Sequence, residues 1–156
     1  MFDIVLYQPE IPPNTGNVIR LCANVGAHLH LIEPLGFEID DKRLRRAGLD
    51  YHECVQMQIH PDLETCRKTI DRDWADWYAF TTHASRAHVD VQFPIDAVLL
   101  FGPETRGLPA QVLESLPAAQ RLRIPMRPGQ RSLNLSNAVA VAAFEVWRQN
   151  GFEGAI

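Results

Sequence analysis

The segment DIVLYQPEIPPNTGNVIRLCANVGAHLHLIEP (residues 3–34) predicts a strand, a helix and a second strand in succession. DIVLY is a short apolar run, which is typical of a buried strand. Pro12 and Pro13, with Asn14 as a capping residue, predict the start of a helix, and Gly26 predicts its end. HLHLIEP predicts the second strand. Because two strands joined by a helix usually run parallel in one sheet, this segment predicts an α/β fold.

The same alternation continues to the end of the chain. Further helices are expected near residues 40–48, at PDLETCRKTI (61–70), at PAQVLESL (109–116) and from about Leu133 to Gln149. Further strands are expected at ECVQMQI (53–59), DWYAFTT (76–82), DAVLLFG (96–102) and RLRIP (121–125). The pattern predicts one domain over residues 1–156, with a mostly parallel sheet covered by helices on both faces.

Composition places the chain among ordinary globular domains. It has 156 residues, of which 46% are hydrophobic, so it can bury a core without disulfide bonds or structural metals. The first residues lack a signal-peptide pattern and no apolar run is long enough to span a membrane, so we expect a cytoplasmic protein without membrane contact. The three cysteines lack Cys-x-x-Cys spacing and the six histidines lack a His-Glu-x-x-His helix, which predicts buried thiols and no metal.

Charge separates two kinds of nucleic-acid binding. The net charge of −4 argues against a protein that coats nucleic acid without specificity. The segment DDKRLRRAG nevertheless concentrates basic side chains that suit phosphate contacts, and we take them as candidate RNA-binding residues: Lys42, Arg43, Arg45 and Arg46. A solvated helix face, paired with neighbouring aspartates, explains the same pattern.

Three loops after expected strands have unusual compositions, and one of them is PEIPPNTGNVIR (9–20), where Arg20 is expected to face a cleft or a partner unless it is simply an exposed helix arginine. FGPETRGL (101–108) places Gly102 and Gly107 where backbone could approach a ligand, although a tight turn explains the glycines too. The loop lacks the Lys-Ser/Thr of a Walker phosphate loop, and no Gly-x-Gly-x-x-Gly follows the first strand. RSLNLSNAVA (131–140) brings four small polar side chains to a helix start that needs one cap, which predicts that the others contact a ligand.

Three motifs together resemble those of the SPOUT superfamily of RNA methyltransferases. They are PPNTGNVIRLCAN, FGPETRGLP, and RIPM with RSLNLSNAVAV, in that order. With IEPLGF and DDKRLRRAGLDYHE, the chain is similar over nearly its whole length to the small members that methylate tRNA at the wobble nucleotide. The resemblance implies a SPOUT-type fold with a C-terminal trefoil knot, a homodimer, tRNA as substrate, and S-adenosylmethionine as methyl donor, which leaves as S-adenosylhomocysteine.

The resemblance also implies a set of site residues. Arg20, reaching from the partner subunit, would act at the ribose hydroxyl, with Ser132 and Asn134 orienting the proton. Because arginine stays protonated in proteins, positioning and stabilising negative charge suit it better than removing a proton. Asn14 would support Arg20, unless it caps the first helix. The implied cofactor residues are Phe80, Thr81, Gly102, Glu104, Gly107, Ile124, Ser132 and Leu133, with Glu104 organising the loop or facing the donor's positive end.

Other functions fit the same motifs. The chain could methylate another tRNA position or ribosomal RNA, or it could be a non-catalytic RNA-binding module of the same fold. A nucleotide-binding regulator would bind the donor without transferring methyl groups. Binding of the donor and the position of any methyl group in RNA distinguish these possibilities.

Overall fold

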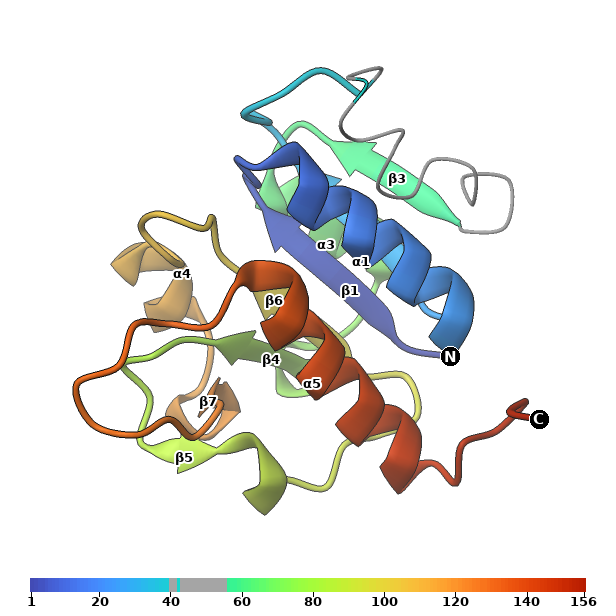
Figure 1. The fold of residues 1–156 in the computed structure, drawn as a ribbon, viewed down its shortest axis with the longest axis vertical. Helices are drawn as coiled ribbons and strands as arrows, with labels where there is room; N and C mark the ends of the chain where they lie inside the picture. The colour runs from blue at the N-terminus through green and yellow to red at the C-terminus, as the bar shows by residue number, and fades with distance from the viewer. Residues whose placement is uncertain (40–41, 43–55) are drawn as a thin grey trace.

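A fully parallel sheet organises the fold. The computed structural model describes residues 1–39, 42 and 56–156, and within these residues seven strands form one sheet in the order β3-β2-β1-β6-β4-β7-β5. All six strand pairs are parallel. The strands are β1 (Asp3–Tyr7), β2 (His28–Ile32), β3 (Met57–His60), β4 (Trp77–Phe80), β5 (Arg86–Ala87), β6 (Val98–Phe101) and β7 (Arg121–Arg123). The expected parallel sheet is confirmed (Figure 1).

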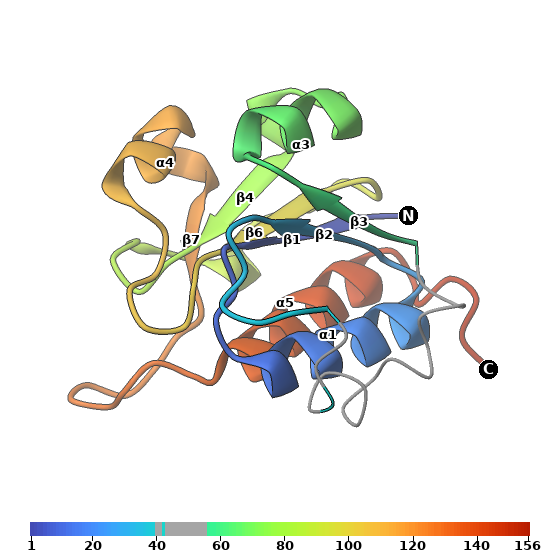
Figure 2. The ribbon, with the colours of Figure 1, turned by 90° about the horizontal axis from the view of Figure 1, so that it is seen from above.

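Helices cover both faces of the sheet, as expected. Figure 2 shows α1 (Pro12–Val25) and α5 (Leu135–Gln149) on one face, with α3 (Leu63–Ile70) and α4 (Ala110–Ser115) on the other. Among the described residues, three short 3₁₀ helices lie in the connections: η2 (Trp74–Asp76), η3 (His88–Asp90) and η4 (Ala118–Gln120). None of the helices in the described part of the chain is both long and apolar enough to cross a membrane.

Alternate residues of the central strands supply two hydrophobic cores. Ile4 and Leu6 of β1 join the core beneath α1 and α5, where Val18 and Val139 are fully buried. Val5 points to the opposite face and joins the core beneath α3 and α4. Side chains of a strand alternate between faces, so continuous apolar runs such as VLLF in β6 serve both cores at once.

The structure differs from the sequence expectations at several element boundaries. β5 was not predicted, because two residues are too few to show a hydrophobic pattern. The last helix begins at Leu135, two residues later than expected, because Asn134 is its cap. The predicted basic helix near residues 40–48 lies, apart from the exposed Lys42, outside the described residues.

The expected cap of α1 is wrong. Ile11 occupies the cap position and makes no side-chain hydrogen bond to the helix, while Pro12 and Pro13 fill the first two helical positions. Prolines have no N–H group, so a capping side chain has fewer donors to satisfy there. Asn14 lies within the first turn, and its side chain is used elsewhere.

Two cysteines behave as expected from the sequence. Cys22 and Cys66 are buried thiols in the two different cores. Burial raises the pKa of each thiol to about 12, and the negative charge of Asp3 adds to the effect at Cys66. Both thiols are therefore protonated at neutral pH.

Candidate active site

A cavity of about 560 Å³ lies where the loops that follow four neighbouring strands meet. Its walls include Ile11 and Asn14 after β1, Thr81 to His83 after β4, the loop after β6, and Ile124 with Met126 after β7. The start of α5 closes it with Ser132 to Leu135. The cavity is therefore at the carboxyl edge of the sheet, where open α/β sheets bind their ligands, and its size suits a nucleoside-sized molecule.

The loop after β6 (residues 102–108) is folded back on itself. The Gly107 N–H donates a hydrogen bond to the carbonyl oxygen of Pro103 at 2.9 Å, and Gly107 has a φ of +67°. A Cβ atom on Gly102 would overlap the backbone of Gly107 and Leu108. Glycine is thus required at 102 by a close backbone approach and favoured at 107 by its left-handed conformation.

Two glutamates join this loop to the segment before α1 in a reciprocal way. The Glu104 carboxylate accepts hydrogen bonds from the Glu10 N–H at 2.8 Å, the Ile11 N–H at 3.0 Å and the Asn14 side-chain amide at 3.2 Å. In return, the Glu10 carboxylate accepts from the N–H and hydroxyl of Thr105. Glu104 thus holds a negative charge beside the start of α1, where the helix dipole favours it.

Asn14 extends this link to the start of α5. Its side-chain oxygen accepts a hydrogen bond from the Asn134 amide at 2.9 Å. The Asn134 oxygen accepts in turn from the Ser136 N–H at 3.0 Å and from the Ser136 hydroxyl at 2.7 Å. A continuous hydrogen-bonded chain, Glu104–Asn14–Asn134–Ser136, therefore fixes the three sequence motifs relative to one another.

This chain explains the polar start of α5. Asn134 is the cap, Ser136 supports it, and the exposed Ser132 lines the cavity without belonging to the cap. Of the four polar residues, Asn134 and Ser136 connect the motifs, Ser132 lines the cavity, and Asn137 is exposed and does not line it.

The structure brings together the eight predicted cofactor residues. All line the cavity: Phe80, Thr81, Gly102, Glu104, Gly107, Ile124, Ser132 and Leu133. Asn134, predicted to be catalytic, lines it too. Arg20 is exposed on α1 and is not among the described residues that line the cavity of its own chain. Arg43, Arg45 and Arg46 lie outside the described residues.

Sequence reasoning missed several residues at the site. Glu10 and Arg106 were not predicted, although Glu10 binds Thr105 and Arg106 donates a hydrogen bond to the Gln8 side chain at 3.0 Å. Thr82, His83 and Met126 also line the cavity. Met126 belongs to the RIPM motif, whereas the sequence signal of Thr82 and His83 is their position at an expected strand end, which many residues without a function share.

Comparison with known proteins gives consistent matches along the chain. The SpoU rRNA Methylase family matches residues 1–144. A tRNA (cytidine(34)-2'-O)-methyltransferase of Burkholderia cenocepacia is 62% identical over 154 residues, with 99% of each chain covered. An Escherichia coli protein of the same name is 56% identical over 156 residues, covering 100% of this chain and 98% of the relative.

A solved structure described as "Structural insights into the 2-OH methylation of C/U34 on tRNA" superposes with a TM-score of 0.89 and 43% sequence identity. The match covers 98% of each chain. Both the fold and the length of the chain therefore correspond to those of its relatives.

Proposed function

The chain belongs to the SpoU rRNA methylase family, and on this premise we propose that it methylates the ribose 2′-hydroxyl of the wobble nucleotide of tRNA, cytidine or uridine at position 34. The relatives named above, 56–62% identical along the full chain, are tRNA (cytidine(34)-2'-O)-methyltransferases. The observation that carries the proposal is the convergence of all three motifs on one cavity.

S-adenosylmethionine is the proposed methyl donor. The cavity offers an apolar wall formed by Phe80, Ile124 and Leu133, together with backbone groups of the loop after β6. Such a mixture suits a flat adenine ring and a ribose, which need apolar contact and a few directed hydrogen bonds. The sulfonium group of the bound donor supplies an electrophilic methyl carbon, so the transfer we propose needs no metal.

The protein's own task is alignment and charge stabilisation. Ser132 and Asn134 lie at the cavity, where they can orient the ribose hydroxyl and its proton. Because the Asn134 side chain is fixed by Asn14 and Ser136, its orientation is set before the substrate binds. This preorganisation is the feature expected of a site that stabilises developing negative charge on the hydroxyl oxygen.

Arg20 is proposed to act in the cavity of a partner subunit. It lies six residues after Asn14 on α1, which corresponds to about 9 Å along the helix axis. Asn14 lines the cavity of its own chain, whereas Arg20 is exposed and is not among the described residues that line it. A homodimer that brings a second chain beside the cavity would supply the guanidinium to position the hydroxyl.

The remaining expectations accompany this function. Lys42, Arg43, Arg45 and Arg46 are proposed to contact tRNA phosphates, because their guanidinium and ammonium groups suit such contacts. Anticodon bases are unstacked, and their exposed edges are accessible to a protein.

We place the protein in the cytoplasm with its tRNA substrate. A C-terminal trefoil knot is proposed for the part of the chain that forms the loops after β6 and β7.

Methylation of unmodified tRNA tests the function directly. Purified protein is incubated with S-adenosylmethionine and tRNA from a strain that lacks the activity, and the nucleosides at each position are measured by mass spectrometry. We expect a 2′-O-methylated pyrimidine at position 34 and unchanged ribose elsewhere. A methyl group at another tRNA position or in ribosomal RNA would contradict the substrate, and an absence of donor binding in calorimetry would contradict the enzymatic function.

A further inference from the structure

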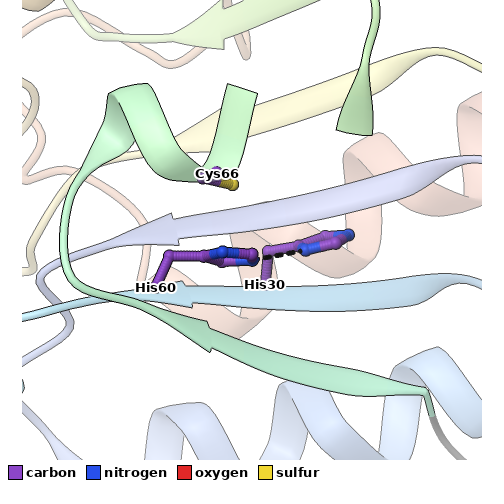
Figure 3. Close-up of side chains that lie close together, drawn as sticks. All are labelled: His30, His60 and Cys66. Carbon is purple, nitrogen blue, oxygen red and sulfur yellow. Dashed lines mark hydrogen bonds between the residues drawn. The ribbon is translucent and has the colours of Figure 1, made fainter. Parts of the chain in front are cut away.

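Three potential metal ligands meet on the sheet face opposite α1 and α5. His30 of β2, His60 at the end of β3 and Cys66 of α3 are all buried, and their ligand atoms lie within 4.8 Å of one another. Figure 3 shows the two imidazole rings side by side with the Cys66 sulfur close by, on the α3 side of the strands. None of the three residues is among those that line the candidate active site.

Hydrogen bonds fix which nitrogen atoms of the two histidines face each other. His30 Nε2 lies 3.1 Å from Asp3 Oδ1, and His30 Nδ1 lies 3.0 Å from His60 Nε2. An ionised carboxylate only accepts hydrogen bonds, so Asp3 keeps the proton on His30 Nε2 and leaves a lone pair on Nδ1 when the ring is neutral. The nitrogen of His30 that faces His60 is therefore the one able to bind a metal.

We propose that His30 Nδ1, His60 Nε2 and Cys66 Sγ form a zinc-binding site that is separate from the methyltransferase cavity. Two imidazoles and a thiolate are ligands that Zn²⁺ prefers. The Asp3 carboxylate completes the arrangement, because zinc-bound histidines commonly donate their second N–H group to a carboxylate.

The distances between the three ligand atoms are not far from those of a tetrahedral zinc site. Zinc bonds of about 2.1 Å to nitrogen and about 2.3 Å to sulfur place two nitrogens about 3.4 Å apart and a nitrogen about 3.6 Å from the sulfur. The observed nitrogen separation is 3.0 Å in a direct hydrogen bond, so the imidazoles need to separate by a few tenths of an ångström and to turn so that both lone pairs point at the metal. The sulfur lies within 4.8 Å and needs to approach by roughly 1 Å, which rotation about its side chain can provide.

Binding has a defined proton balance. His30 keeps its proton on Nε2, the proton of His60 moves to Nδ1, and the Cys66 thiol releases its proton to solvent as the zinc–sulfur bond forms. A coordinating metal deprotonates a thiol even where burial otherwise keeps it neutral. Three protein ligands leave the fourth tetrahedral position of the zinc to a water molecule. The zinc ion would connect β2, β3 and α3 at one edge of the sheet and so stabilise the fold.

Cobalt binding tests the site by a readout that is independent of methyl transfer. Co²⁺ replaces Zn²⁺ in such sites and produces a thiolate-to-cobalt charge-transfer band together with visible bands of tetrahedral cobalt. We expect both with the reduced, full-length protein at one equivalent of Co²⁺, and we expect added Zn²⁺ to abolish them. Zn²⁺ should also raise Tm by about 5 °C or more relative to protein treated with a chelator.

Matched variants identify the thiol. Cys66→Ala should lose the charge-transfer band, whereas Cys22→Ala, which removes the buried thiol of the other core, should keep it. Cys54→Ala should keep it as well. His60→Gln provides a second variant and should weaken Co²⁺ binding by at least about tenfold, because even residues that only support a ligand contribute that much.

Two results would overturn the proposal. The first is the absence of a thiolate-to-cobalt band in the spectrum of the wild-type protein. This result does not depend on whether a variant folds. The second is a band that persists in Cys66→Ala or disappears in Cys54→Ala, because the ligand would then be a different cysteine.

Discussion

Gly102 is the residue at which the backbone of the candidate site is closest to itself. An added Cβ would overlap the Leu108 nitrogen and the Gly107 backbone, and backbone atoms cannot move aside as a side chain can. We expect Gly102→Ala to open the loop and weaken S-adenosylmethionine binding more than tenfold, the equivalent of about 1.4 kcal/mol. Isothermal calorimetry measures the change in Kd.

Gly107→Ala is the matched control for Gly102→Ala. Its added methyl group meets no atom within 4 Å, but φ is +67°, so the cost is conformational and amounts to about 1 kcal/mol of folding stability. If both variants bound the donor equally well, close packing of the loop would not be what shapes the cavity.

Glu104 is a second residue of the candidate site whose substitution should have a specific effect. Its carboxylate accepts from two backbone N–H groups and one side-chain amide. Glu104→Gln replaces one acceptor with an NH₂ group that faces donors, so we expect the free energy of unfolding to fall by about 1–3 kcal/mol. Urea unfolding measures this. Glu114→Gln, on the exposed side of α4, should leave stability unchanged.

At the scale of single residues, the sequence predicted which residues belong to the site better than it predicted which residues they contact. The motif residues of the cavity were predictable because the chain resembles the SPOUT superfamily, whose motifs imply them. Asn14 was assigned the wrong local role, because its partners Glu104 and Asn134 are 90 and 120 positions away along the chain. The cluster of His30, His60 and Cys66 gave no signal for the same reason: strand pairing and helix packing, rather than local spacing, bring these residues together.

Among the elements, α5 shows how competing caps shift a boundary. Ser132 and Asn134 are both good capping residues, so the sequence alone allowed the helix to start after either of them. The structure selects Asn134, which accepts from the Ser136 N–H and is itself held by Asn14. A tertiary hydrogen bond thus decides which of two equivalent local signals is used.

The other end of α5 is fastened by Glu145. Its carboxylate accepts two hydrogen bonds from Arg148, at 2.9 and 2.8 Å, and one from Gln149 at 2.8 Å. Gln149 also accepts from the Phe93 N–H and donates to the Val91 carbonyl, which attaches the helix to the chain before β6. The hydrogen bond from Arg148 lowers the pKa of Glu145 from 4.5 to about 2, against the opposing effect of burial.

This pKa shift gives α5 a pH-dependent contribution to stability. Because the folded pKa is lower than the unfolded one, the contribution is complete above about pH 4.5 and is lost as pH falls toward 2. Solvent screening limits it to about 1 kcal/mol. We expect Glu145→Gln to destabilise the protein by this amount at pH 6 and by little at pH 2.5, as measured by urea unfolding.

Glu64→Gln is the control for that measurement. Glu64 pairs with Arg67 at 3.8 Å and with Lys68 at 3.5 Å, on the exposed side of α3. These longer, solvated pairs should contribute less, so the variant should follow the wild-type pH profile closely. A pH profile of Glu145→Gln that matched the wild type would exclude the proposed ion pair as a source of acid sensitivity.

For the whole molecule, the class of fold followed from the sequence and the arrangement of strands did not. Alternating strand and helix patterns require a parallel sheet with two covered faces, and the apolar runs of β1 and β6 indicate burial on both sides. The insertion of β6 between β1 and β4 depends on long-range packing that no local pattern encodes. Local patterns therefore place the cavity at the strand ends, whereas the particular loops that line it followed from the family resemblance.

The basic segment allows RNA binding to be separated from donor binding. Arg43 and Arg46 belong to the proposed tRNA contacts and lie apart in sequence from the motifs that line the cavity. We expect replacement of both by alanine to weaken tRNA binding at least about tenfold, with a reduced salt dependence, while Kd for S-adenosylmethionine stays unchanged. Filter binding measures the affinity for tRNA and calorimetry measures the affinity for S-adenosylmethionine. Equal losses of the two affinities would contradict the separation of RNA binding from donor binding.

The proposed dimeric site can be tested by mixing two inactive proteins. Arg20→Ala removes the residue given to the partner, and Ser132→Ala removes a residue of the chain's own cavity. A heterodimer of the two retains one complete site, made of Ser132 from the first protein and Arg20 from the second.

After unfolding and refolding equal amounts together, about half of the dimers are mixed and carry one intact site of two, so activity should return to about a quarter of wild type. Each protein refolded alone should remain inactive. Activity that did not recover in refolded, mixed dimers would mean that Arg20 and Ser132 act within the same chain, and the geometry of α1 would then need another explanation for the exposed position of Arg20.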